Sequence, residues 1–245
     1  MKSLLLVTLI LFTLSSCKEA AQEASTSTDS NESCEYENIS STKRSPQTID
    51  ELTDLINEMP KPLSIPCLVE SFARPLKVNL TLSSLSAQPA VGRTSPRVFI
   101  FYGDLVISIV PEGKGAYLLE ASFMYTDSTS LKAEYEFPIS QKIEYAYPFD
   151  RIKTDSAVNG EGTVCRTCHN DESLDNAASV PGAFTSVAIK PESSMSISTF
   201  KSELNSCEFH DDKSYRCQMI QAIFKGEDLV ATEFPSGTPK WIDTL

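Results

Sequence analysis

The feature that most constrains the fold is an alternation of apolar and polar residues with a period of two. It is clearest in residues 76–82 (LKVNLTL) and 131–137 (LKAEYEF), and it predicts strands because successive strand side chains point to opposite faces. Apolar residues also flank Tyr102-Gly103-Asp104, as in a hairpin. Short connections between such strands predict an antiparallel meander with one buried face, and we expect its charged residues to face solvent.

Helices are predicted at both ends of this body. Thr48 and Glu51 form a capping box before an apolar stripe, and Pro60 ends the helix. Residues 198–205 and 212–224 suggest a helical pair. The predicted fold class is therefore α+β, with an antiparallel β sandwich or half-barrel body over residues 47–150 and the helical pair within residues 151–245. No catalytic residues are predicted in the body, which we interpret as a scaffold.

The N-terminus has the pattern of an export signal. A lysine, an apolar run and small residues make residues 1–16 a predicted signal peptide. The segment Leu14-Ser15-Ser16-Cys17 resembles the lipobox of bacterial lipoproteins, which implies that Cys17 is acylated and holds the chain on a lipid bilayer. Lys18 stands where that pattern places Asp for inner-membrane retention, so the outer membrane of a bacterial cell envelope is favoured. The alternative is an ordinary signal peptide, with Cys17 paired elsewhere.

Composition and charge limit the partners. Residues 17–46 are mostly Ser, Thr, Glu and Asn, which predicts a lipidated flexible tether.

The chain carries a formal net charge of −12. A nucleic-acid partner is excluded on this ground, since phosphate binding needs a basic surface. An acidic body instead favours basic partner proteins through electrostatic steering.

The motif with the most specific chemistry is Cys165-Arg166-Thr167-Cys168-His169, a C-x-x-C-H pattern. Over these five residues the chain resembles c-type cytochromes. The resemblance implies a covalent haem c, with Cys165 and Cys168 as thioether donors and His169 as the proximal iron ligand. The export signal agrees with this expectation, because haem c is attached outside the cytoplasm.

The other cysteines fit the same interpretation. Removing Cys17 and the motif pair from the seven cysteines leaves four, an even number suited to two disulfides outside the cytoplasm. Cys207 and Cys217 are expected to pair across a polar turn. Cys34 and Cys67 would then form the second disulfide.

Three alternatives to haem remain open at the motif. Cys165 and Cys168 could form a redox-active disulfide of the thioredoxin kind, although no βαβ pattern surrounds them. Together with Cys207 and His210 they could bind zinc. Otherwise both cysteines belong to structural disulfides and the chain carries no cofactor.

A second axial iron ligand is sought among the residues after the motif, where His210, Met195 and Met219 are the candidates. Met219 is expected in a helix core, which leaves Met195 or His210, or an open position. The favoured function is single-haem electron transfer with a redox partner protein. The alternative is a non-enzymatic envelope lipoprotein that binds a ligand or partner through its β body. A haem enzyme such as a peroxidase is a third hypothesis, with His210 as its distal imidazole.

Overall fold

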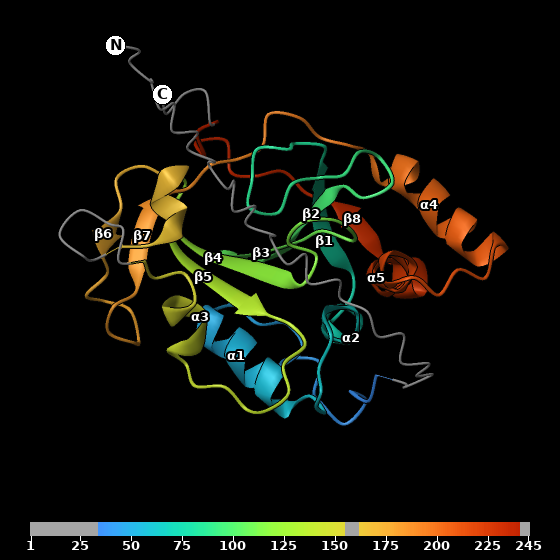
Figure 1. The fold of residues 1–245 in the computed structure, drawn as a ribbon, viewed down its shortest axis with the longest axis horizontal. Coiled ribbons are helices and arrows are strands. Elements are labelled where there is room, and N and C mark those ends of the chain that lie inside the picture. Colours follow the sequence, from blue (N-terminus) through green and yellow to red (C-terminus); the bar gives the residue numbers. More distant parts are fainter. Residues whose placement is uncertain (1–33, 155–161, 241–245) are drawn as a thin grey trace, which may run out of the picture. The chain divides into compact units, whose positions relative to one another are not determined.

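The fold is described here from a computed structural model, which defines residues 34–154 and 162–240. The predicted α+β class is confirmed, because helices pack beside one mixed sheet in the order β6-β7-β5-β4-β3-β2-β1-β8 (Figure 1). The strands are β1 (Leu76–Thr81), β2 (Arg97–Tyr102), β3 (Leu105–Ile109), β4 (Leu118–Thr126), β5 (Thr129–Glu136), β6 (Ser173–Leu174), β7 (Phe184–Val187) and β8 (Leu229–Ala231).

The centre of the sheet is the expected meander. β1 to β5 pair antiparallel in sequence order, and the β2–β3 hairpin turns at Gly103 and Asp104. The residues after position 150 extend this sheet at both edges: β7 pairs with β5, and β8 joins β1 in parallel. The strands lie in one open sheet rather than in two stacked sheets, because helices cover one of its faces.

The helices in the described residues include five α-helices and two 3-10 helices: α1 (Ile49–Glu58), α2 (Ile65–Ser71), α3 (Tyr147–Asp150), η2 (Val164–Thr167), α4 (Ile197–Phe209), α5 (Tyr215–Phe224) and η3 (Lys225–Glu227). The capping prediction for α1 is confirmed, since the Thr48 side chain accepts a hydrogen bond from the Glu51 N–H at 3.1 Å. The Glu51 carboxylate in turn accepts from the backbone N–H of Gln47 at 2.6 Å. Residues 143–146 form a loop that leads into α3, although the alternation of Ile143, Tyr145 and Tyr147 is typical of a strand.

The main core lies between the sheet and the helices drawn below it in Figure 1. Leu52 and Leu55 of α1 and Leu68 of α2 pack against apolar side chains from the central strands. Tyr135 of β5 is fully buried in this layer, where its hydroxyl lies 2.8 Å from Thr53 Oγ1 and donates to the Ile49 carbonyl at 3.1 Å. The odd-numbered residues of β5, Leu131, Ala133 and Tyr135, all face this core. The period of two in the sequence therefore predicts the core face of β5 correctly.

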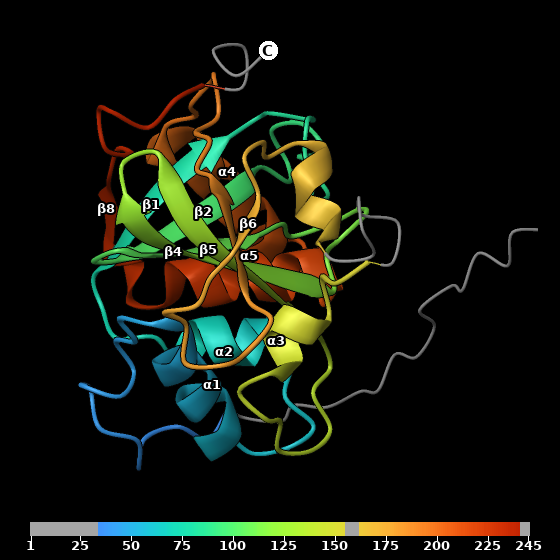
Figure 2. The same ribbon diagram turned by 90° about the vertical axis from the view of Figure 1, so that its left-hand side faces the viewer.

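Loops and the short 3-10 helix η2, rather than α-helices, cover the opposite face. Residues 82–87, 164–169 and 188–193 come together over β2 to β5, and the C-terminal segment closes one side (Figures 1 and 2). The Phe234 ring packs edge-on against Phe99 and Phe101, with centroids 5.0 and 5.1 Å away. The polar face of the strands, expected to meet solvent, is therefore enclosed by segments that are distant in sequence.

The predicted tether extends less far than residue 46. Cys34 forms a disulfide with Cys67 of α2, and Tyr36 packs against the core. Arg44 donates hydrogen bonds to the carbonyls of Ile39 and Ser71, both at 3.1 Å. The residues from Cys34 onward therefore belong to the folded body, because a covalent bond and buried contacts compensate for the polar composition. The signal peptide, the lipobox with Cys17 and the first part of the tether lie outside the described residues.

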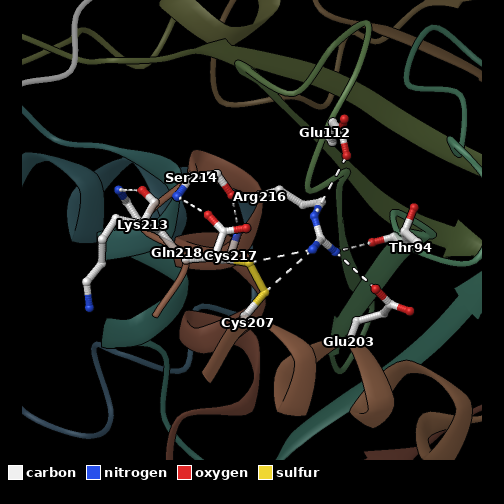
Figure 3. The surroundings of a disulfide bond; sticks show 10 residues. Thr94, Glu112, Glu203, Cys207, Lys213, Ser214, Arg216, Cys217 and Gln218 are labelled. Atoms are coloured by element: carbon white, nitrogen blue, oxygen red, sulfur yellow. Dashed lines mark hydrogen bonds and ion pairs between the residues drawn. A yellow bond between two sulfur atoms is a disulfide. The ribbon is translucent and has the colours of Figure 1, made fainter. Parts of the chain in front are cut away.

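The C-terminal helical pair is joined by the second disulfide, between Cys207 of α4 and Cys217 of α5. Arg216 lies against it, with a terminal nitrogen 3.7 and 3.6 Å from the two sulfurs (Figure 3). The same guanidinium donates to Glu203 of α4 at 3.2 Å and to the Thr94 carbonyl at 3.1 Å. The disulfide and Arg216 together, which we call the helical clasp, connect α4 and α5 to the loop before β2. In the part of the chain described, no helix combines the length and apolar character that crossing a bilayer requires.

Candidate cofactor-binding site

A cavity of about 460 Å³ lies between the loop-covered face of the sheet and the motif segment. Its volume is within the range of about 300–1,000 Å³ that is usual for small-molecule and cofactor sites. Cys165, Cys168 and His169 all line it. The structure therefore brings the three predicted site residues to one cavity, although the strands that form its floor precede them by about 30 residues or more.

The motif begins in η2, which has a well-defined start. The Thr163 side chain accepts from the Cys165 N–H at 3.1 Å, and the Thr163 N–H donates to Glu172 at 2.9 Å. The Thr163 hydroxyl also donates to the same carboxylate. The backbone N–H of His169 then donates to the Cys165 carbonyl at 2.8 Å, so one turn fixes both ends of the motif. The turn holds the thiols and the imidazole in one rigid unit at the cavity wall.

The His169 imidazole has the orientation expected of a metal ligand. Its Nδ1 lies 2.8 Å from the carbonyl of Val187, the last residue of β7. A carbonyl accepts only, so Nδ1 carries the proton and Nε2 keeps its lone pair. Burial, with Lys132 and Arg97 adding to it, lowers the pKa of His169 to about 3. The ring is therefore neutral at physiological pH, which is the form that binds iron.

The two motif sulfurs are unpaired in this structure, and Cys168 is exposed at the cavity rim. Burial raises the pKa of the Cys165 thiol to about 11. A reactive redox cysteine has the opposite shift, since its thiolate must be stabilised by neighbouring positive groups. The environment of Cys165 thus does not fit a thioredoxin-like nucleophile.

The cavity floor is charged. Arg97 of β2 forms an ion pair with Glu120 of β4 and donates to Ser108 Oγ at 2.6 Å. Glu134 of β5 faces Glu120 across the strand pair, and burial raises its pKa although Arg151 lies 3.2 Å away. Lys132, two residues before Glu134 on β5, is 7% exposed. The charges are placed by strand register, because even-numbered positions of β4 and β5 share this face.

One wall of the cavity is apolar. Phe99, Val106, Met124 and Ala188 form a buried cluster, and Phe234 packs onto it. All five side chains also line the cavity. A flat cofactor with an apolar ring and charged substituents needs this combination of an apolar wall beside a charged floor.

The predicted second ligands are not brought to this cavity. Met195 lies at an isolated bridge, where its N–H donates to the Leu80 carbonyl at 2.7 Å, and it is not among the lining residues. His210 caps the exposed end of α4, against the ring of Phe209, and is also not a lining residue. Met219 lies fully buried in the core, as expected. Met124 is the one methionine among the described lining residues, and it precedes the motif, whereas the expected ligands follow it.

The zinc set predicted as an alternative is not assembled. It requires the Cys207 thiolate, but this sulfur is bonded to Cys217. Cys207, Cys217 and Asp212 do lie close enough together to suggest a metal site. Two disulfide sulfurs supply no thiolate, however, and zinc sites use cysteine in that form.

Arg97, Lys132 and Glu120 are the site residues that the sequence analysis missed. Their strand positions follow the alternation, which is why they were expected in solvent. The only available signal was the charged residue at each of the positions 132, 134 and 136 of β5, combined with a cofactor motif later in the chain. Comparisons with protein-family models, with curated protein sequences and with solved structures find no match to this chain.

Proposed function

We propose that the protein is a c-type haem protein that transfers single electrons at the surface of a bacterial cell envelope. The observation that carries the proposal is the meeting of two unpaired motif thiols and a neutral, oriented imidazole at one cavity of cofactor size. Cys165 and Cys168 would hold the haem, and the Nε2 atom of His169 would bind its iron. Haem iron supplies a one-electron couple when bound.

The rim of the cavity suits exchange of electrons with a partner. Cys168 is exposed there, and Leu85 and Val164 are large apolar residues that line the cavity while remaining 67% and 55% exposed. A partner protein can approach a group held at such a rim, and apolar side chains support a transient contact. With a net charge of −12, the chain favours a basic redox partner.

Localisation is part of the same proposal. Cys17 would carry the lipid anchor, and the outer membrane is favoured because Lys18 follows it. A Cys17→Ala variant should leave the membrane fraction of a lipoprotein-processing host, whereas the wild-type chain should stay there. Retention of the variant on the membrane would contradict an acyl anchor.

The haem proposal is tested by expressing the full chain in a host that attaches haem c. The purified protein should keep a visible haem spectrum after denaturation, and its mass should exceed that of the chain by one haem. A Cys165→Ser, Cys168→Ser variant should lose both signals. Cys165 and Cys168 found bonded to each other, without haem, would favour the non-enzymatic partner-binding lipoprotein instead.

The two histidines of the chain make a matched pair for the iron ligand. His169→Gln should change the spectrum of the native protein, because the imidazole oriented by Val187 is lost. His210→Gln should leave it unchanged, since His210 lies outside the cavity lining. An equal effect of both variants would contradict the assignment. It would also reopen a distal role for His210, which the peroxidase hypothesis needs.

A further inference from the structure

Lys132 is the least expected residue of the cavity. It lies in the middle of β5, opposite Ser122 of β4, and both residues line the cavity. A lysine is almost never so deeply buried without a partner. At 7% exposure its ammonium group can obtain little stabilisation from bulk water.

The carboxylates on the cavity floor near Lys132 already have ion-pair partners, whereas the Lys132 ammonium has none among the described residues. Glu120 is paired with Arg97, and Glu134 is paired with Arg151. The third acidic lining residue, Glu192, is exposed and solvated. The Lys132 Nζ donates one hydrogen bond, to Ser130 Oγ at 2.7 Å, and in the described part of the chain no carboxylate lies within salt-bridge distance of it.

The second lysine of the cavity differs in this respect. Lys190 Nζ donates to the carbonyls of Pro235 and Ser236, at 3.5 and 3.1 Å, and it is partly exposed. Its donors are thus engaged by the C-terminal segment, whereas two of the three Lys132 donors have no partner among the described residues. Burial lowers the pKa of Lys132 to about 8, which shows the cost of keeping its charge in this place.

We propose that Lys132 is the anchor of an anion subsite in the cavity, which binds a carboxylate group. The Lys132 ammonium donates to the carboxylate, and the fixed charge pair of Arg97 and Glu120 marks one side of the subsite. A buried charge is tolerated when it is paired and hydrogen-bonded, so the bound anion supplies what the fold leaves out.

Two molecules can supply such a carboxylate. One is the haem itself, through a propionate, and this source rests on the proposed function. The other is a free small carboxylate that enters the cavity. Both share the same contact with Lys132, so the experiment separates them by comparing the haem-free full chain with the haem-loaded protein.

The probe is sodium formate, added at constant ionic strength to protein uniformly labelled with ¹⁵N, so that the lysine Nζ atoms and the backbone amides are both observed. The Lys132 resonance is identified by its loss in Lys132→Met. In the haem-free chain it should shift with formate and saturate. Lys132→Met should weaken formate binding about tenfold or more, followed at the backbone amide of Ser130, because a charge-assisted hydrogen bond is lost. Lys190→Met is the matched control and should leave the affinity within about twofold, since a partly exposed charge acts weakly.

The outcomes are distinct. Saturable binding to the haem-free chain alone assigns the subsite to the cofactor's own carboxylate, and binding that persists with haem assigns it to a free anion. No saturable shift in either form, or equal affinity in wild type and Lys132→Met, overturns the proposal. If the chain never acquires haem, the proposed function fails, and the haem-free measurement still decides whether the subsite exists.

Discussion

Lys132→Met is expected to stabilise the haem-free protein in a buffer without carboxylates. The lysine pKa of 10.5 in an unstructured chain falls to about 8 in the folded state. At about 1.4 kcal/mol per pKa unit, this difference costs the folded state about 3 kcal/mol while the amine is protonated. Methionine has a similar length and no charge, so it removes the penalty. It also removes the hydrogen bond to Ser130, worth about 1 kcal/mol. The net gain in free energy of unfolding near pH 7 is therefore about 2 kcal/mol.

The pH dependence follows from the direction of the shift. Below about pH 8 both the folded and the unfolded state hold the proton, so the wild-type penalty is complete. Between about pH 8 and 10.5 the folded state releases the proton first, and the penalty disappears. The advantage of Lys132→Met should therefore shrink over this interval and become a deficit of about 1 kcal/mol above it, where only the lost hydrogen bond counts.

Urea unfolding of both proteins, repeated across this pH range, measures the difference directly. Titrating groups that Lys132 does not influence cancel, because they are common to the two chains and have the same environment in both. Lys213→Met is the control, since Lys213 is an exposed residue, and it should change the free energy of unfolding by less than about 0.5 kcal/mol at every pH. A stability difference for Lys132→Met that does not vary with pH would refute the electrostatic reasoning.

Three further outcomes are expected. Tyr135→Phe should lower the free energy of unfolding by about 1–2 kcal/mol, because a buried hydroxyl with two partners is lost; urea unfolding checks this, and no change would contradict it. The double variant Cys207→Ser, Cys217→Ser should lose about 2–4 kcal/mol of the free energy of unfolding in the same assay, the usual value for a disulfide that closes a short loop. Stability equal to wild type would show that the helical clasp does not need the bond. In haem-loaded protein, Met124→Leu should shift the visible spectrum or the reduction potential, whereas Met195→Leu should leave both unchanged, because only Met124 lines the cavity; the reverse result would restore Met195 as the ligand candidate.

The sheet could be predicted from the sequence because its strands pair in chain order. The alternation marks the core face of β5, and the hairpin at Gly103 joins neighbours. The alternation cannot show what covers the second face of a strand. The alternation around Lys132 and Ser122 is the same whether these side chains meet solvent or a loop from a distant part of the chain. The sequence therefore does not reveal the cavity floor.

The site was predictable only where its chemistry is local in sequence. Cys165, Cys168 and His169 are close together in the sequence, and their spacing alone predicts a shared candidate site. The Val187 carbonyl that orients His169 is a backbone atom on β7, so no residue type identifies it. Composition also misplaced the end of the tether, because the covalent link at Cys34 outweighs the polar sequence around it.

The position of Phe234 has a consequence for the order in which the molecule is assembled. A chain emerges with its N-terminus first, so β2 to β5 can form while the motif is still being made. The side of the cavity that Phe234 closes, against Phe99 and Phe101, is made about 100 residues after the end of β5. While the chain is being made, this side of the cavity therefore stays open until Phe234 follows, which gives a bulky ligand time to enter.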